Sequence, residues 1–537
     1  MGATVPSACG VRPSSRSLVV VYDHVIVGAG SAGCVLASRL SADPGRTVLV
    51  LEAGGWDRRQ EIGIPAAFSK LFHTAYDWDY TTVPQAGMNG REMYWPRGKG
   101  IGGSSSINAM MWVRGVPADF DPWPPGWSYE DVLPYFKRSE DAARTDPTHV
   151  GVGGPIRIED QRDPNPGTHL FVAACQRAGI PRNPNASVGT NLGVDYTQVT
   201  QRRGRRESSA TAYLHSIRNR PNLAIETGAH VARLVIDEGR VTGVSYVIDG
   251  ELRTVRVRRD VILAGGAVNT PQILMLSGVG PADHLREVGI DPIVDLPGVG
   301  SNLSDHLAAG LVMGTTRSDT LVSAERPREI FNYLVRRRGL LTSNVGEAHA
   351  FVQSRPDLAG PDIELIFAPV PFLDHGDTEP QGHGYTIASI LLQPESRGTI
   401  RLASADPFAA PLIDPAYLSV DSDLDTLAWG VEKVLEVVAT EPLQEVMTQP
   451  MRPDVVPTTR AEIVDGIRTW GETLYHPVGT AAMGAGEDGV VDPSLRVRGV
   501  EGLRVADASV MPRLNRGHTH APTVMIAEKA SELILTE

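Results

Sequence analysis

The chain has 537 residues, of which 42% are hydrophobic and 21% are charged, as in a soluble globular protein. Its formal charge of −13 at pH 7 argues against nucleic acid as a partner, because phosphate backbones bind basic surfaces. A chain of this length exceeds one compact core, so we expect two domains.

The amino-terminal residues and the cysteines indicate the cellular compartment in which the protein works. We expect residues 1–19 to form a flexible extension, and we find no signal peptide or membrane-spanning segment. Cys9, Cys34 and Cys175 have no paired spacing, which is typical of a reducing compartment, and no spacing suggests a metal site. We therefore predict a cytoplasmic protein without a bound metal.

Residues 21–55 have the pattern of one strand–helix–strand unit. A β-branched run at 25–27 is followed by G-x-G-x-x-G at 28–33 and then by apolar residues at helical spacing. Glycines at these positions permit a tight turn and a close approach to a pyrophosphate, which the helix N-terminus attracts. The unit predicts a dinucleotide site. By itself it does not choose between NAD and FAD.

An acidic residue, Glu52, ends the second apolar run of this unit. A carboxylate at that position accepts hydrogen bonds from both ribose hydroxyls of an adenosine, and it repels a 2′-phosphate. NADP is therefore disfavoured.

Two later stretches also place backbone groups where a ligand binds. Residues 95–110 contain a second glycine-rich loop, suited to wrapping a phosphate or packing against a flat ring. Residues 260–276 repeat the order strand, glycine turn and helix, which lies at the carboxyl edge of a parallel sheet. The basic run at 202–206 is interpreted as a solvated turn.

The region from about 315 to 472 carries no cofactor motif. Strand patterns at 363–367 and 386–393 and a helical pattern at 423–439 predict a second domain, whose sheet would wall the substrate pocket. Motifs return after it, with YHPVGT at 475–480 and a strand ending in an acid at 503–507.

Taken together, these motifs resemble the glucose–methanol–choline (GMC) flavin oxidoreductase family from about Tyr22 to Leu535. The resemblance rests on VIVGAGSAGCVLASRLS with VLVLEAGG, RGKGIGGSSSINAMMWVRG, GAVNTPQILMLSGVGP, YHPVGT and HTHAPTVMIAEKA, which occur in the family's order. It implies an α/β fold: a Rossmann-type FAD-binding domain with an interleaved α+β substrate-binding domain built on an antiparallel sheet. We assign 20–160, 206–315 and 472–537 to the first domain, and 161–205 and 316–471 to the second.

The resemblance also implies which residues would bind FAD, matched position by position. The ADP half would contact Gly28, Gly30, Ser31, Gly33, Glu52 and Ala53, with Trp78, Val231 and Ala264 near the adenosine. The pyrophosphate and flavin would lie against Gly102, Gly103, Asn108, Ala109, Asp507, Ala508 and Thr519. Ile107 stands where covalently flavinylated members carry histidine, which predicts a non-covalent FAD.

Alcohol oxidation needs a base for the hydroxyl proton, and histidine suits that task near neutral pH. His476 matches the family's active-site histidine and is assigned as the base, with His520 as its partner; their roles could exchange. His518 lies two residues before His520, so extended backbone would place both on one face. His306 is interpreted as a loop histidine without a role.

Several functions stay open at this point. The leading hypothesis is FAD-dependent oxidation of a primary alcohol to an aldehyde, with O2 or another compound as electron acceptor. Choline-like, aminoglycoside, aryl and furanic alcohols all remain possible substrates, and the acidic balance mildly favours a cationic one. The alternatives are a hydroxynitrile lyase, an NAD-dependent dehydrogenase and a non-catalytic flavin-binding protein. Phe367, Phe372 and Trp112 are expected to be core residues rather than substrate contacts.

Overall fold

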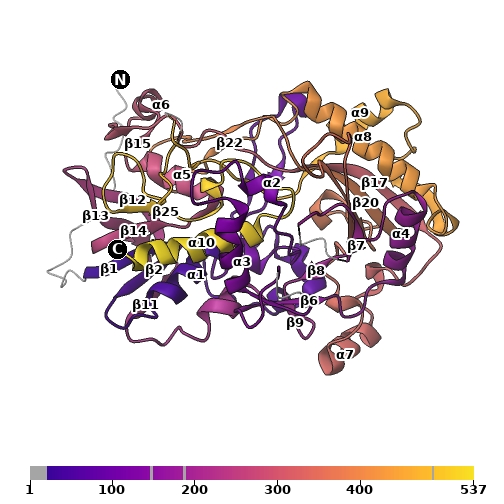
Figure 1. The fold of residues 1–537 in the computed structure, drawn as a ribbon, viewed down its shortest axis with the longest axis horizontal. Helices are drawn as coiled ribbons and strands as arrows, with labels where there is room; N and C mark the ends of the chain where they lie inside the picture. The colour runs from indigo at the N-terminus through magenta and orange to yellow at the C-terminus, as the bar shows by residue number, and fades with distance from the viewer. Residues whose placement is uncertain (1–20, 145–148, 185–188, 487–488) are drawn as a thin grey trace, which may run out of the picture.

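A computed structural model describes residues 21–144, 149–184, 189–486 and 489–537. The predicted extension at 1–19, with Cys9, lies outside the described residues. Two main sheets lie toward opposite ends of the long axis of the molecule (Figure 1). The predicted fold class is confirmed: one sheet is largely parallel and flanked by helices, and the other is antiparallel.

The first sheet contains the strand of the amino-terminal unit at its centre. The strands β11, β2, β1 and β14 are parallel neighbours, β25 joins β14 in parallel, and β13 and β12 add an antiparallel edge. Both faces of the central strands are covered, which explains their continuous apolar runs. The strands span β11 (Leu223–Thr227), β2 (Val48–Glu52), β1 (Val21–Val27), β14 (Glu251–Leu263), β25 (Leu503–Val505), β13 (Arg240–Ile248) and β12 (His230–Asp237).

Helices that follow the parallel strands begin at one edge of this sheet. The helix α1 (Ser31–Leu40) follows β1, and α5 (Gly266–Leu276) follows β14. The carboxyl-terminal helix α10 (His520–Leu535) packs against α1, and Figure 1 shows the two side by side. Helix N-termini and strand ends therefore gather at the carboxyl edge, where open α/β sheets bind ligands.

The second sheet has the order β18, β19, β20, β17 and β23, with β24 beside β17, and every pair is antiparallel. One face is covered by α8 (Asp421–Val438), whose Gly430 lies against Ile363 and Ser389. Because side chains alternate along a strand, the neighbouring residues point to the opposite face. The strands span β18 (Ala348–Val352), β19 (Ile363–Ala368), β20 (Gly384–Leu391), β17 (Leu307–Thr315), β23 (Met447–Arg452) and β24 (Glu472–Thr473).

Two strands differ from the predicted domain ranges. The strand β17 lies in the range 206–315 and β24 begins at 472, both given to the FAD-binding domain, yet both pair within the antiparallel sheet. An apolar run in the sequence does not reveal which sheet a strand joins. We propose that the second domain begins before Leu307 and ends after Thr473.

The remaining elements connect or cover these sheets. No helix in the described part of the chain combines the length and apolar character needed to cross a membrane. The other helices are α2 (Pro117–Phe120), α3 (Tyr129–Ser139), α4 (Pro166–Arg177), α6 (Ala282–Glu287), α7 (Pro327–Arg336) and α9 (Arg460–Trp470). The other strands are β3 (Tyr80–Thr81), β4 (Tyr94–Trp95), β5 (Glu140–Ala142), β6 (Ile156–Asp160), β7 (Gly193–Tyr196), β8 (Gln198–Val199), β9 (Gln201–Arg202), β10 (Arg205–Arg206), β15 (Val279–Gly280), β16 (Val294–Asp295), β21 (Thr399–Arg401) and β22 (Leu412–Asp414).

Candidate active site

One cavity is lined by residues of both sheets and joins the two domains. Its first part lies at the carboxyl edge of the parallel sheet, and its second part lies against the face of the antiparallel sheet that α8 leaves open. Most residues predicted to bind the cofactor line it: Gly28, Gly30, Ser31, Glu52, Ala53, Trp78, Gly103, Asn108, Ala109, Val231, Ala264, Asp507, Ala508 and Thr519. His476 and His520 line it as well, whereas Gly33 and Gly102 do not.

Glycines are required here because backbone approaches backbone. Gly28 has φ +99°, and a Cβ on it would lie 2.6 Å from the carbonyl oxygen of Ala264. A Cβ on Gly33 would lie 1.9 Å from the Gly28 oxygen, so Gly33 allows α1 to pack on the turn. A Cβ on Gly103 would lie 2.7 Å from the Cα of Gly30. The two glycine-rich loops therefore meet and form one floor of backbone.

Glu52 is buried directly behind the first glycine turn. Its carboxylate accepts the Ala29 N–H at 2.8 Å and the Gly54 N–H at 2.8 Å. Burial raises the pKa of Glu52, and these backbone donors partly oppose that rise. Because Ala29 belongs to the turn before α1, Glu52 both shapes the turn and presents an acceptor to the cavity.

Arg206 holds the second glycine-rich loop from behind. Its guanidinium donates to the Asn108 carbonyl at 2.6 Å, to Asn108 Oδ1 at 2.7 Å and to the Ile62 carbonyl at 2.8 Å. The predicted solvated turn is therefore wrong for Arg206, which is 4% exposed because these oxygens replace water. Burial lowers its pKa to about 9.

Asp507 ties β25 to the turn before α5. It accepts the Gly266 N–H at 2.8 Å and the Thr270 hydroxyl at 2.6 Å, and its other oxygen accepts from Ser509. Burial raises the pKa of Asp507, and these donors oppose the rise. The acid predicted at the end of this strand therefore fixes the edge of the cavity beside Ala508.

His476 is placed by two buried neighbours. Its backbone N–H donates to Asp305 Oδ1 at 2.6 Å, and its Nδ1 lies 2.9 Å from Nδ1 of His306. Burial lowers the pKa of His476 well below its ordinary value, and the charge of Arg97 lowers it further. His476 is therefore neutral at neutral pH.

The contacts of His306 define the tautomer of His476. Nε2 of His306 lies 3.1 Å from the Leu392 carbonyl, which can only accept, so this nitrogen carries the proton. Burial lowers the pKa of His306 to about 3, although the carbonyls of Leu392 and Asn515 oppose that drop, so His306 is neutral and its Nδ1 can accept. The close contact then requires the proton on Nδ1 of His476. Its Nε2 is left as the unprotonated nitrogen, the form a general base needs.

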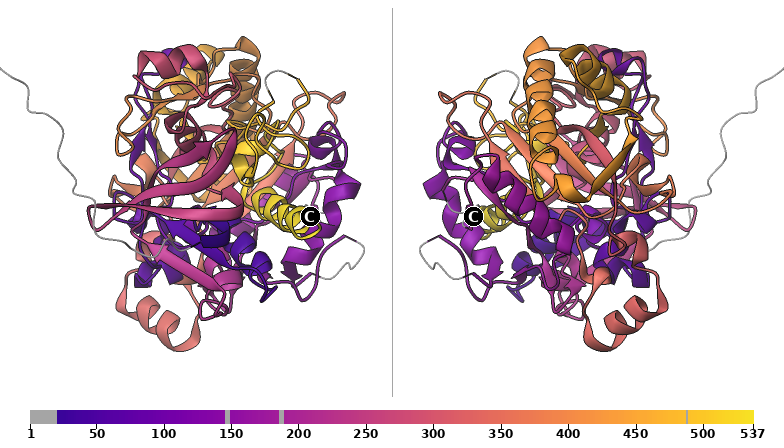
Figure 2. Two further views of the ribbon diagram at one scale, coloured as in Figure 1. Left: turned by 90° about the vertical axis from the view of Figure 1, so that its left-hand side faces the viewer. Right: turned by 90° about the vertical axis from the view of Figure 1, so that its right-hand side faces the viewer.

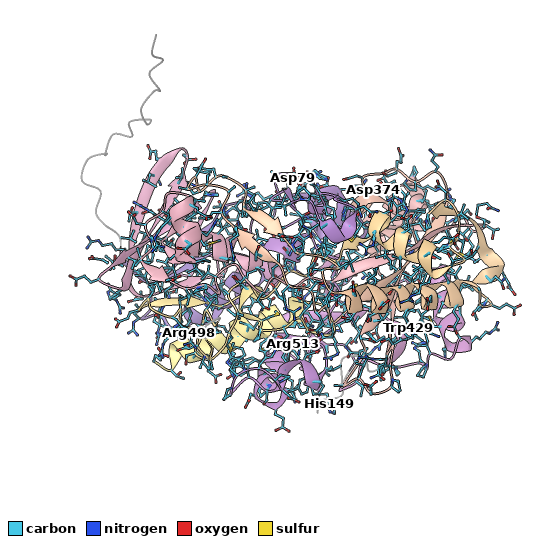
Figure 3. The ribbon with its side chains drawn as sticks, turned by 90° about the horizontal axis from the view of Figure 1, so that it is seen from above. Asp79, His149, Asp374, Trp429, Arg498 and Arg513 are labelled. Atoms are coloured by element: carbon cyan, nitrogen blue, oxygen red, sulfur yellow. The ribbon has the colours of Figure 1, made fainter. Side chains whose placement is uncertain are left out.

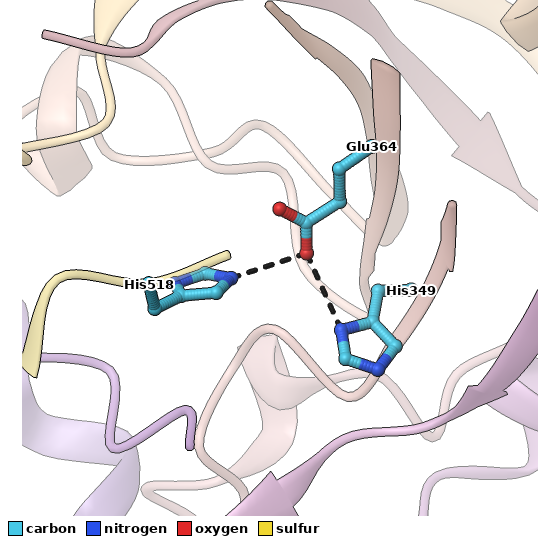
Figure 4. A group of neighbouring side chains, drawn as sticks. All are labelled: His349, Glu364 and His518. Atoms are coloured by element: carbon cyan, nitrogen blue, oxygen red, sulfur yellow. Dashed lines mark hydrogen bonds and ion pairs between the residues drawn. The ribbon is translucent and has the colours of Figure 1, made fainter. Parts of the chain in front are cut away.

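His518 lies beside His476, with ring centroids 4.8 Å apart in an edge-to-face arrangement. Its Nε2 contacts Glu364 Oε1 at 3.1 Å, and the same oxygen lies 3.3 Å from Nδ1 of His349 (Figure 4). Burial by itself raises the pKa of Glu364, but the charge of His518 and hydrogen bonds from both rings hold it below its usual range.

The group of His349, Glu364 and His518 has the donor set of a metal site, with ligand atoms within 4.8 Å of one another. No spacing in the sequence indicated it, because the three residues come from β18, β19 and the loop before α10. The contacts of both imidazoles with one carboxylate oxygen are also those of an acid paired with two histidines.

His520 points to a different set of neighbours. It is the first residue of α10, its Nε2 lies 3.2 Å from the Ser209 hydroxyl, and its ring meets Trp112 edge-on. Burial and the charge of Arg206 lower its pKa to about 4. The expectation that His518 and His520 share a face is wrong, because Thr519 between them is helical (φ −72°, ψ −12°) rather than extended.

The cavity rim carries paired charges. Arg452 donates to both oxygens of Asp374 at 2.6 and 2.9 Å, and both residues line the cavity. His73 contacts Asp79 at 2.6 Å and Asp377 at 2.9 Å. Figure 3 shows Asp79 and Asp374 along the same edge of the molecule. These pairs join the segment around Asp79 to the second domain at the edge of the cavity.

Family models described as GMC oxidoreductase match residues 22–308 and 394–527, which together cover more than half of the chain. The chain belongs to the GMC oxidoreductase family. An alcohol dehydrogenase [acceptor] of Pseudomonas putida is 43% identical over 532 residues, 96% of each chain. Mitochondrial choline dehydrogenase of Homo sapiens is 39% identical, covering 96% of this chain and 89% of that one. Among solved structures, a pyridoxine 4-oxidase has a TM-score of 0.88 at 32% identity, covering 96% and 99%.

FAD is the cofactor expected of a GMC oxidoreductase, and this cavity suits it. The glycine floor keeps the cradle free of side chains, and the α1 N-terminus bears no side-chain cap that would compete with a phosphate. At the other end, Nδ1 of His520 is buried, lines the cavity and has no hydrogen-bond partner, as expected beside a polar ring edge.

Sequence reasoning missed three residues of this GMC oxidoreductase's site. His306, interpreted as a loop histidine, is fully buried against His476, and Glu364 and His349 stand behind His518. Glu364 and His349 are single polar residues within otherwise apolar strands, and this was the sequence feature that could have indicated a role for them.

The three aromatic residues expected in the core have different outcomes. Phe367 stacks on Phe171 and does not line the cavity, so that prediction is confirmed. Trp112 is buried beside His520 and donates to Glu140 at 2.9 Å. Phe372 lines the cavity, so for this residue the prediction is wrong.

Proposed function

We propose that this GMC oxidoreductase oxidises a primary alcohol to its aldehyde with non-covalent FAD. The observation that carries the proposal is the orientation of His476, a buried neutral histidine whose Nδ1 is engaged by His306 and whose ring lines the cavity. The unprotonated Nε2 is suited to take the hydroxyl proton.

The residues around the base have separate tasks in this proposal. When bound, FAD supplies the hydride acceptor, at flavin N5. His518, rather than His520, is the partner of His476, because the His476 and His518 rings meet at 4.8 Å, whereas His520 contacts Ser209 and Trp112. Glu364 orients His518, and Arg97, which lines the cavity and donates to the Tyr475 carbonyl at 2.7 Å, supplies a positive charge beside the segment of His476.

The predicted cofactor residues remain our proposal for the FAD site. The glycines at 28, 30 and 103 would give the pyrophosphate close access to the α1 N-terminus, and Glu52 would bind the ribose hydroxyls. Gly33 and Gly102 would act indirectly, by packing. Ile107 is 4% exposed and lines the cavity where a covalent link would need a nucleophile, which supports a non-covalent flavin.

For the substrate we propose a neutral, apolar alcohol rather than a cationic one. Phe68, Phe72, Phe372, Val345 and Ile366 line the second part of the cavity. The carboxylates that line it in the described structure all have partners: Glu52 and Asp507 bind backbone donors, Asp374 binds Arg452, and Glu472 binds Arg91 and His375. Because each of these carboxylates already has a hydrogen-bond or ion-pair partner, the lining favours an uncharged substrate.

The test is anaerobic mixing of the purified, flavin-loaded protein with benzyl alcohol, 1-octanol and choline, followed by air. Bleaching of the flavin band by the neutral alcohols, and not by choline, is the expected result. Fast recolouring in air identifies an oxidase, and slow recolouring identifies a dehydrogenase with another acceptor. Cleavage of mandelonitrile without any bleaching would instead establish the lyase. Acid precipitation should release the flavin into the supernatant, and a yellow pellet would refute the non-covalent link.

A further inference from the structure

The helix α7 stands out from the body of the protein. It projects at the lower right in Figure 1 and at the bottom of both views in Figure 2. Of its ten residues, Tyr333 alone is buried, and its hydroxyl donates to the Gly63 carbonyl at 3.0 Å. The helix is therefore attached along one side, and its outer side is left to solvent.

The outer side of α7 is apolar. Phe331, Leu334 and Val335 are 64%, 63% and 63% exposed, and Ile330 is 41% exposed. Single exposed apolar residues are ordinary, but four on one projecting helix form a patch that needs a partner. Because the spacing 330, 331, 334 and 335 follows a helical turn, these side chains form one continuous face.

Positive charge borders this apolar face. Residues 325–338 contain five arginines against two glutamates, on a chain whose formal charge is −13. Arg326, Arg328 and Arg336 are exposed. The turn between β9 and β10 adds Arg203 and Arg205: a Cβ on Gly204 would lie 2.8 Å from the Arg337 carbonyl, so the turn packs against the end of α7. The basic run that the site did not explain is therefore part of this surface.

We infer that α7 docks this protein on an anionic lipid bilayer. An amphipathic helix that combines an aromatic and aliphatic face with flanking arginines binds the interface between headgroups and acyl chains. Acidic lipids attract the arginines, while the rest of the molecule, being negative, stays away. A second copy of this chain fits less well, because a symmetric pair would bring two sets of arginines together.

The surroundings of α7 connect it to the cavity. Leu321 and Leu340, just before and just after the helix, belong to one apolar cluster with Phe68 and Phe72, and the two phenylalanines line the cavity. Docking through α7 would bring this apolar side of the cavity toward the lipid, the phase that concentrates apolar alcohols. This consequence rests on the proposed function, but the docking itself does not.

The test is co-sedimentation of the flavin-loaded, full-length protein with vesicles of phosphatidylcholine, with or without phosphatidylglycerol. We expect binding to the anionic vesicles and little to the neutral ones. The double variant F331S/L334S should bind at least tenfold more weakly. R328Q/R336Q should bind about 25-fold more weakly, since each arginine near an anionic surface contributes about fivefold. Added salt should imitate the arginine variant.

Matched controls change the same kinds of residue elsewhere. Val152 and Val455 are 62% and 75% exposed, and V152S/V455S should bind as the unmodified protein does. R253Q/R286Q removes two exposed arginines from other surfaces and should also bind normally. Flavin content and oxidation of a water-soluble alcohol should stay unchanged in all four variants, which separates loss of docking from misfolding.

Two outcomes would overturn the inference. One is absent vesicle binding, or binding by F331S/L334S as tight as that of the unmodified protein. The other is a dimer in sedimentation velocity that F331S/L334S converts to a monomer without any vesicle binding, which would assign α7 to a second copy. Both readouts are independent of turnover, so they stand even if no alcohol bleaches the flavin.

Discussion

The two ends of the cavity are built from different material. At the parallel sheet the lining is largely backbone: two glycine-rich loops in contact, a bare helix N-terminus and the end of β14. At the antiparallel sheet the lining is side chains, and the four histidines and one glutamate that form the polar cluster come from five separate segments. At the first end, Gly28 and Gly103 leave no room for a side chain, whereas the second end depends on the chemistry of its side chains.

The largest effect is expected from adding one methyl group to the backbone floor. In Gly28→Ala the new Cβ would lie 2.6 Å from the Ala264 oxygen at a positive φ, so the turn cannot keep its shape. We expect complete loss of the bound flavin, measured from the visible absorption of the purified protein. Gly55→Ala is the matched control, because nothing lies within 4 Å of that Cβ. A Gly28→Ala protein that still contains flavin would contradict the view that this end of the cavity depends on its backbone shape.

A second prediction separates chemistry from cofactor binding. His476→Gln should retain flavin in full, and kcat should fall by about 10²- to 10⁴-fold because the general base is gone. Rapid mixing without oxygen measures the rate of flavin reduction directly. If His476→Gln loses flavin as Gly28→Ala does, the two ends are not independent.

The third prediction distinguishes His518, in the loop before α10, from His520, the first residue of α10. His518→Asn should slow flavin reduction by about 10²-fold, since His518 contacts His476 and Glu364. His520→Asn, whose imidazole contacts Ser209, should slow it by less than about tenfold. The reverse order would restore the assignment of His520 as partner of the base.

A smaller effect is expected from the residue that positions the base. His306→Leu removes the acceptor of the His476 Nδ1 proton, so the ring loses its fixed tautomer. We expect kcat to fall about tenfold at unchanged KM, with partial recovery in His306→Asn, whose amide can both donate and accept. Equal rates in the Leu and Asn variants would show that His306 only fills space.

The smallest effect at neutral pH concerns stability. Burial depresses the pKa of His306 to about 3 and of His520 to about 4, against an ordinary value of 6.5. The unfolded chain therefore binds protons first as the pH falls below 6.5, so the stabilisation is complete above 6.5 and is lost toward pH 4 and 3. Thermal unfolding should show a falling midpoint over that window. His520→Gln should flatten the slope, and an unchanged slope would count against a neutral buried His520.

The sequence by itself determined the fold class, the family and the glycine-rich loops that line one end of the cavity. These depend on local patterns: a buried strand, glycines at fixed spacing and a helix start, all within 21–55 and 95–110. The turn and helix start depend on residues that are close together in the chain, so a short sequence motif is enough to predict them.

Only the tertiary structure decided how the histidines are grouped. His306, Glu364 and His349 carry no motif, and they reach His476 and His518 because β17, β18 and β19 share one sheet beside the loop before α10. Likewise, one helical residue at 519 sent His518 and His520 to different neighbours. Side-chain contacts between distant segments depend on sheet order and on single backbone angles, and periodicity in the sequence records neither.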